Sequence, residues 1–147
     1  MPRFYWDFGR AKSYLEKDQT PWTPALSQMF ALDVALDRLL KEGLKKIIAR
    51  HQRLAQMTRD GVKELGLSLF AEESHASNTV TAINVPQGVD GGKLNKIMRE
   101  EYDIVLGGGQ QNMKGKIFRI GHLGWVSDED IKAVLKALEL ALPKARI

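Results

Sequence analysis

Apolar residues recur every three to four positions from Ala25 to Leu65, a spacing that predicts helix over the whole stretch. Gly43 divides it into two runs, so it forms either two helices or one long, bent helix. Gly66 follows the last apolar position and is expected to end the helix, because glycine readily takes the left-handed conformation common there. The apolar residues of the first run spread over more than one face of the helix; they are Leu26, Met29, Phe30, Leu32, Leu36, Leu39 and Leu40.

Beyond Gly66 the pattern becomes shorter and alternates between strands and helices. Runs rich in β-branched or aromatic residues predict four strands, at 67–70, 79–85, 103–106 and 117–120. Asp90 is placed to cap a helix that reaches Tyr102, and Ser127 to cap a last helix that Pro143 should stop. This order predicts an α+β fold, in which a long N-terminal helix precedes a small mixed, mainly antiparallel sheet with helices on one face.

The first 24 residues break this regularity. The aromatic residues among residues 1–19 follow no clean period and have no evident partner within the chain, so this segment is expected to pack on another surface. Two prolines within Thr20–Pro24 exclude a helix interior and predict a stiff, extended turn. The hydroxyls of Thr20 and Thr23 are also placed to cap the next helix. We therefore expect an aromatic lead-in with a Thr-Pro loop over residues 1–24 and one domain over residues 25–147.

Composition limits the classes to which this protein can belong. Of its 147 residues, 44% are hydrophobic and 27% are charged, as in globular domains. The net charge of +4 is too small to indicate binding of nucleic acid. The absence of cysteine excludes disulfides, thiolate metal sites and iron–sulfur clusters in this chain. We expect a cytoplasmic protein, because we find neither an apolar N-terminal run of signal length nor a stretch able to span a membrane.

Arg119 is the charged residue in the otherwise apolar run 117–120. Because an unpaired buried charge is costly, its guanidinium must either reach solvent from an edge strand or meet an anion. The arginine fork fits a carboxylate through two parallel hydrogen bonds. Gly107–Gly109 lacks the lysine and hydroxyl of a phosphate-binding loop and predicts a turn. His51 lies on an apolar stripe with no second ligand at metal-binding spacing, so we predict no metal site.

Two motif regions, Gly107–Gln110 and Gly115–Gly124, resemble the C-terminal small domain of the class V pyridoxal-phosphate aminotransferases. The resemblance is closest to the branch of serine–pyruvate and alanine–glyoxylate aminotransferases, some of whose members carry the label soluble hydrogenase subunit. Three more segments resemble that branch in the same order, so the resemblance covers essentially the whole chain; they are Thr20–Pro24, Ser77–Thr81 and Val85–Asp90. It implies the small domain of a fold type I pyridoxal-phosphate (PLP) enzyme.

The resemblance also implies roles for two residues. Arg119 matches the arginine of the family's Phe-Arg-Ile-Gly motif, which holds the α-carboxylate of the substrate. Thr23 matches a threonine that donates to the cofactor phosphate in the neighbouring subunit, although Thr20 stands where the family commonly has an aromatic residue. The family's Schiff-base lysine and the aspartate at the pyridine nitrogen lie upstream of the point that Met1 resembles. We therefore expect no catalytic residue in this sequence and no tight binding of PLP by it alone.

Two interpretations of the function follow from this resemblance. In the first, the chain is the small-domain part of an aminotransferase of serine or alanine to glyoxylate or pyruvate type, inactive alone. Its partners are then a second copy or a large-domain chain, with amino acid and keto acid substrates. In the second, it is a non-catalytic ligand-binding or interaction subunit derived from that domain. Both exclude hydrogen chemistry in this chain, because nickel–iron and iron–sulfur sites need thiolates.

Overall fold

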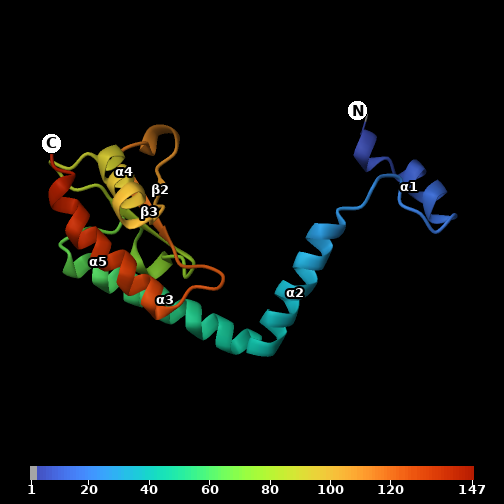
Figure 1. Cartoon of the computed structure of the whole chain (residues 1–147), viewed down its shortest axis with the longest axis horizontal. Coiled ribbons are helices and arrows are strands. Elements are labelled where there is room, and N and C mark those ends of the chain that lie inside the picture. The colour runs from blue at the N-terminus through green and yellow to red at the C-terminus, as the bar shows by residue number, and fades with distance from the viewer. Residues whose placement is uncertain (1–2) are drawn as a thin grey trace. The chain divides into compact units, whose positions relative to one another are not determined.

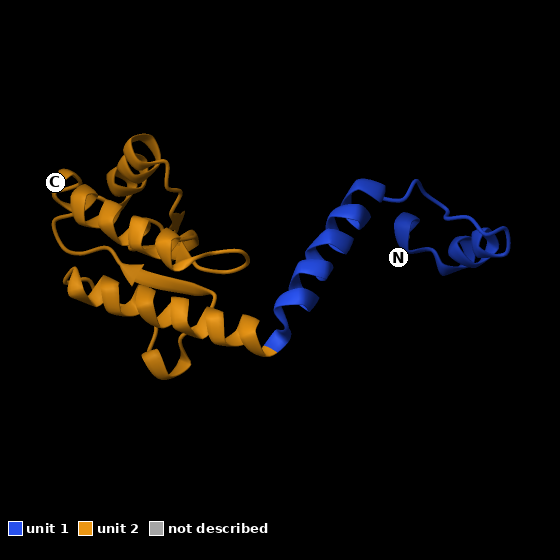
Figure 2. Ribbon diagram, turned by 60° about the horizontal axis from the view of Figure 1, so that its bottom comes forward, with its two compact units in different colours: residues 1–44 blue, residues 45–147 orange. Residues whose placement is uncertain are grey.

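The structure is a computed structural model that describes residues 3–147. The chain divides into two compact units, Met1–Leu44 and Lys45–Ile147 (Figure 2). The first unit is helical, and the second holds the sheet and three of the helices that Figure 1 labels. The division after residue 24 that the sequence suggests stays a prediction.

The aromatic lead-in of unit 1 is folded and has a partner inside its own unit. It forms η1 (Phe4–Trp6) and α1 (Phe8–Leu15), a helix that the sequence pattern did not predict. Asp7 starts α1 by accepting the backbone N–H of Arg10 at 3.0 Å. The ring centroids of Phe4 and Tyr5 lie 4.3 and 5.0 Å from that of Trp22. Phe4 and Tyr5 therefore have a partner within the chain, which the sequence did not reveal. Trp6 and Phe8 stay largely exposed, so packing of the lead-in on another surface stays a prediction.

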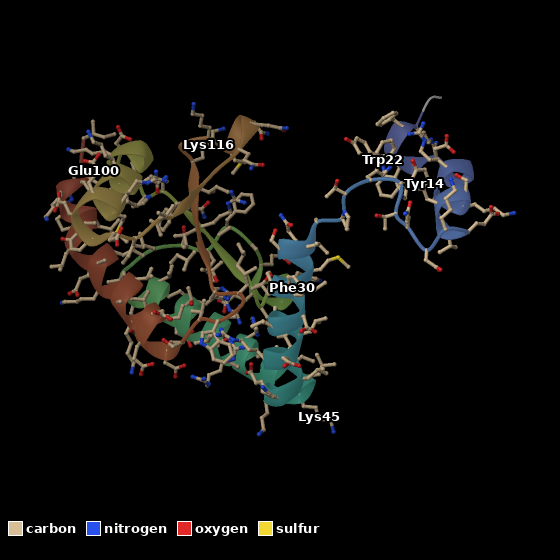
Figure 3. All side chains as sticks on the ribbon, turned by 45° about the vertical axis from the view of Figure 1, so that its right-hand side comes forward. Tyr14, Trp22, Phe30, Lys45, Glu100 and Lys116 are labelled. Carbon is tan, nitrogen blue, oxygen red and sulfur yellow. The ribbon has the colours of Figure 1, made fainter. Side chains whose placement is uncertain are left out.

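Helix α2 (Leu26–Glu42) completes unit 1 and has no buried residue among those described. Its large apolar side chains are exposed, and Phe30, which Figure 3 labels, is 71% exposed. The helix ends at Gly43, whose φ of +84° breaks the helical path, so the sequence pattern from Ala25 to Leu65 forms two helices. Neither Thr20 nor Thr23 caps α2, because its N-cap is Ala25 without a side-chain bond.

All of α3 (Leu44–Glu64) except its first residue belongs to unit 2, and the helix ends as the sequence predicts. Gly66 has a φ of +74° and donates its N–H to Lys63 O at 2.9 Å, while the N–H of Leu67 reaches Val62 O. These two bonds satisfy carbonyls that the helix end leaves without partners.

The sheet has three strands, β1 (Val80–Asn84), β2 (Gly107–Gly108) and β3 (Ile117–Gly121), in the spatial order β1-β3-β2. Both pairings are antiparallel. The strands predicted at 67–70 and 103–106 do not form. Residues 67–70 make only an isolated bridge between Leu69 and Ile83. Residues 103–106 do not pair, and the short strand β2 forms directly after them. The turn expected at Gly107–Gly109 is thus in part an edge strand, because the pairing partner in β3 outweighs the low strand propensity of glycine.

One hydrophobic core joins this sheet to three helices, α3, α4 (Gly91–Tyr102) and α5 (Asp128–Lys144). Phe118 and Ile83 of the sheet are fully buried in it, and so are Leu94 and Leu138 of the helices. This confirms the predicted α+β arrangement. No helix among residues 3–147 is long and apolar enough to cross a membrane.

Both predicted helix caps of unit 2 are present. The Asp90 side chain accepts the N–H groups of Gly92 and Lys93, at 2.7 and 3.0 Å. Ser127 and Asp130 form a reciprocal capping box at the start of α5. Pro143 does not stop α5, which continues to Lys144. Its missing N–H removes only one bond, and the N–H of Ala145 still reaches Ala141 O at 3.1 Å.

Candidate functional site

Arg119 lies in the middle of β3 with neighbours on both sides. It is paired with Ala82 of β1 and with Gly107 of β2. Phe118 and Ile120 point into the core, so the alternation of the strand directs Arg119 to the opposite face of the sheet. Arg119 is half-buried there and is neither a fully solvated surface arginine nor a core residue.

Two glycines let the Arg119 side chain lie across β2. A Cβ on Gly107 would be 3.4 Å from Arg119 Nε and 3.6 Å from Nη2. The Arg119 side chain therefore lies against Gly107, on the side where another residue would carry its side chain. Arg119 Nη2 donates to the carbonyl oxygen of Gly108 at 2.9 Å. This bond fixes the guanidinium at the β2 edge, and its partner is a neutral carbonyl. The positive charge therefore stays available to an anion.

Two buried polar atoms beside β2 have no hydrogen-bond partner within residues 3–147, namely Arg119 Nε and Asn95 Oδ1. Asn95 belongs to α4, and its Nδ2 would be 3.6 Å from a Cβ on Gly108. Buried donors and acceptors without partners are uncommon and often mark functional sites. No sequence signal marks Asn95, because the burial of its Oδ1 depends on the packing of α4 beside the glycine strand.

Two histidines hold the loop that follows Arg119. His122 is fully buried, donates from Nδ1 to Asn78 O at 3.2 Å and accepts the Thr81 hydroxyl at Nε2, 2.9 Å away. Burial lowers the pKa of His122 below its ordinary value, and the charge of Arg59 adds to this effect. His51 Nε2 accepts the N–H of Gly124 at 3.2 Å, and its Nδ1 donates to Ile47 O. Both histidines therefore position backbone, which agrees with the packing role predicted for His51.

Thr23 lies in unit 1, in the loop between α1 and α2. It is exposed and lines a surface hollow of about 770 Å³ together with Thr20 and Trp22. The Thr20 hydroxyl donates to Trp22 O at 2.7 Å, whereas the hydroxyl of Thr23 has no partner among the described residues. Thr23 thus offers one free donor to a ligand in this hollow.

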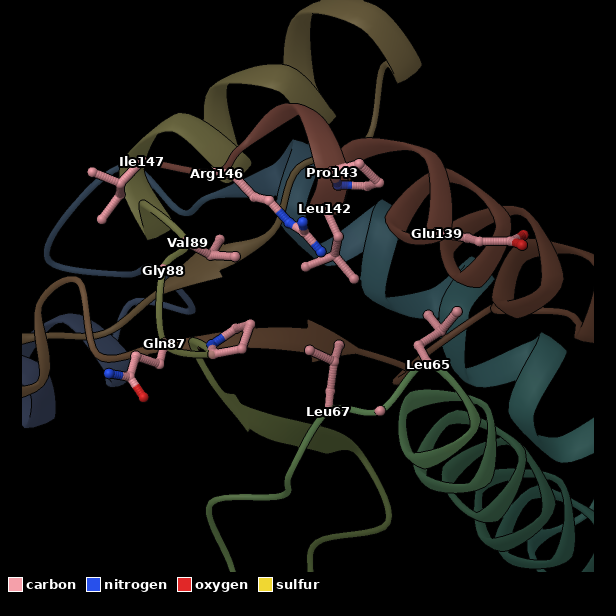
Figure 4. Close-up of a pocket in the computed structure, with 12 residues that line it drawn as sticks. Leu65, Leu67, Gln87, Gly88, Val89, Glu139, Leu142, Pro143, Arg146 and Ile147 are labelled. Carbon is pink, nitrogen blue, oxygen red and sulfur yellow. The ribbon is translucent and has the colours of Figure 1, made fainter.

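A second hollow, of about 620 Å³, lies between the end of α3, the segment Gln87–Val89 and the end of α5 (Figure 4). Its walls include Leu65 and Leu142, and the Arg146 side chain reaches over it. Arg146 is exposed, so water already solvates its charge. Within residues 3–147 no three histidine or acidic side chains come together as a metal site.

No protein-family model matches the chain. The small subunit of a soluble hydrogenase from Synechococcus sp. is 47% identical to it over 142 residues, which are 97% of this chain and 37% of that protein. The serine–glyoxylate aminotransferase of Arabidopsis thaliana is 41% identical over 123 residues, which are 83% of this chain and 31% of the relative. The chain thus spans about a third of the length of the curated relatives it matches.

The comparison with solved structures agrees with these relatives. The crystal structure of pyridoxamine–pyruvate aminotransferase from Mesorhizobium loti superposes with a TM-score of 0.81 and 41% sequence identity. The match covers 85% of this chain and 32% of that one. In each comparison, therefore, nearly the whole of this chain corresponds to one part of a longer protein.

Proposed function

Because this chain belongs to the class V aminotransferases, as their C-terminal small domain, we propose that it supplies the substrate-carboxylate site of such an enzyme through Arg119. The observation that carries the proposal is the geometry of Arg119. Its guanidinium lies over Gly107, is held by the Gly108 carbonyl and has no acidic partner among the described residues. A carboxylate at the β2 edge would satisfy its remaining donors and its charge.

The cofactor of the proposed enzyme is PLP, and Thr23 is the residue of this chain that fits it. The free hydroxyl of Thr23 is suited to donate one hydrogen bond to a phosphate oxygen, as its match in the family implies. A single hydroxyl cannot hold a phosphate that carries nearly two charges, so most of the phosphate site belongs to other parts of the enzyme. When bound, PLP supplies the electron sink that transamination needs.

Transamination also requires a lysine and a pyridine-nitrogen partner, which the family places in its large domain. We propose that a large domain provides these groups and that this chain alone is inactive. The bare apolar face of α2 supports an assembly with a second copy or with that domain, because exposed apolar patches of this extent are usually covered by partners. The cysteine-free sequence supplies no thiolate for the nickel–iron or iron–sulfur sites that hydrogen chemistry needs in this chain.

The test is to follow keto acid formation from alanine or serine and glyoxylate, with PLP and the purified chain. We expect the rate with the chain alone to equal the rate with free PLP, and we expect it to rise when a large-domain chain is added. The contrary result is a rate with the chain alone that lies well above that of free PLP and that Arg119→Gln abolishes. That result would show a complete active site in this chain and refute the proposal that a large domain supplies the lysine.

A non-catalytic role is the second candidate, favoured by the half-buried guanidinium of Arg119, which has no acidic partner among the described residues even without a large domain. In that case alanine should bind the chain alone, without PLP, and Arg119→Gln should abolish binding. Isothermal titration calorimetry distinguishes the two, because the enzyme role predicts that alanine binds measurably only after the large domain and PLP are added.

A further inference from the structure

A third cavity, of about 270 Å³, lies between α3, β1 and the loop that precedes β1. Its size is close to the lower end of small-molecule pockets. Arg119 and Thr23 are not among the residues that line it. The lining residues that matter for its chemistry are Arg59, Leu69, Ala76, Ser77, Val80 and Ala82.

Arg59 carries a buried positive charge in this cavity. It is only 8% exposed, and its hydrogen bonds go to neutral acceptors, Ser77 O at 3.3 Å and Gln56 Oε1 at 3.0 Å. Among residues 3–147 no carboxylate oxygen lies within 4.0 Å of its guanidinium. Burying a charge without a counterion is costly, since neutral acceptors replace only part of the lost hydration.

The charge of Arg59 acts on its neighbours. Burial is the main reason that the pKa of His122 is lowered, and the positive charge of Arg59 lowers it further. The pKa of Asp60 is also lowered, chiefly by its hydrogen bond from Gln56 and to a smaller degree by Arg59. The Arg59 charge thus acts on groups around the cavity and favours an anion beside its guanidinium.

We propose that this cavity binds a small monocarboxylate with a short apolar tail. One guanidinium balances one negative charge, and its fork matches a carboxylate. Inorganic phosphate, with more than one negative charge at neutral pH, would keep part of its charge uncompensated. Leu69, Val80 and Ala82 line the cavity with apolar groups, which suit an aliphatic tail and disfavour a fully polar ion. The site goes beyond the proposed role of Arg119, because it uses a different arginine on a different element.

The experiment is an NMR titration of the whole chain with butyrate, butyramide and inorganic phosphate, read at the backbone amides of Ser77 and Ala82. It is repeated in Arg119→Gln, so that binding at Arg119 cannot be mistaken for the new site. We expect butyrate to give saturable shifts with a dissociation constant of about 1 mM in both proteins. Butyramide and phosphate should bind at least about tenfold more weakly.

Three variants complete the test. Arg59→Met removes the charge at similar length, Ala76→Leu fills the cavity, and Arg99→Met removes an exposed arginine of α4 as the control. The first two should weaken butyrate binding at least about tenfold, and the control should not. If Arg59→Met does not fold, Ala76→Leu decides alone, because Ala76 has an extended backbone that accommodates leucine. Absence of saturation up to about 50 mM butyrate, equal binding of butyramide or phosphate, or undiminished binding in Ala76→Leu would overturn the proposal.

Discussion

Replacing Gly109 by alanine should damage the edge strand that holds Arg119. A Cβ at this position would lie 2.0 Å from Met113 O and 2.6 Å from Met113 C, both of which are backbone atoms that no rotamer change can move. The turn at Gln111–Met113 must therefore shift by about 1 Å or more. Such overpacking costs about 1–3 kcal/mol, and loss of the bond from Gly109 N–H to Ile117 O adds about 1 kcal/mol.

The neighbouring glycine provides the matched control. A Cβ on Gly108 would touch only Asn95 Nδ2, at 3.6 Å, so Gly108→Ala should change the stability by no more than about 1 kcal/mol. In urea denaturation followed by circular dichroism, Gly109→Ala should lower the midpoint urea concentration by about 1–3 M relative to the protein without the substitution. Equal midpoints for Gly108→Ala and Gly109→Ala would refute the close approach of the Met113 turn.

Three further predictions concern the scaffold. Gly61→Ala places a Cβ 2.3 Å from Leu135 Cδ1, the movable end of a side chain, and alanine favours the helix by about 1 kcal/mol, so its net cost should stay below about 2 kcal/mol. In a double-mutant cycle, Gly61→Ala combined with Leu135→Ala should cost less than the sum of the two changes. Ser127→Ala removes the capping box of α5 and should lower the free energy of unfolding by about 1 kcal/mol, measured in urea. The lowered pKa of His122 means that the unfolded chain binds more protons than the folded chain near and below a pH of about 6.5, so stability should fall from pH 7 to 5, and His122→Gln should flatten this dependence.

Local sequence signals were sufficient where an element depends on its own residues. β1 is rich in β-branched residues, Asp90 and Ser127 cap their helices, and Gly66 ends α3, all as the pattern predicts. Pro143 shows the limit of such rules. A proline in the last turn removes only one backbone hydrogen bond, and this loss does not end the helix.

The parts that the sequence could not supply depend on tertiary pairing. Gly107 and Gly108 have no strand propensity, and they pair only because β3 lies beside them. The half-buried position of Arg119 depends on the register that places Gly107 opposite it, and a local pattern does not reveal that register. The burial of Arg59 and of the Asn95 Oδ1 atom could not be predicted for the same reason, since a helical pattern does not reveal which polar groups the fold encloses.

The central claim is that Arg119 binds the substrate carboxylate, and steady-state kinetics of the enzyme assembled with its large domain tests it most directly. The measured quantity is kcat/KM for alanine in the native enzyme, in Arg119→Gln and in the control Arg99→Gln. Loss of a charge-assisted, two-bond contact should reduce kcat/KM about 10- to 150-fold in Arg119→Gln, and the control should stay unchanged. An unchanged kcat/KM in Arg119→Gln, with the variant folded, would contradict the claim.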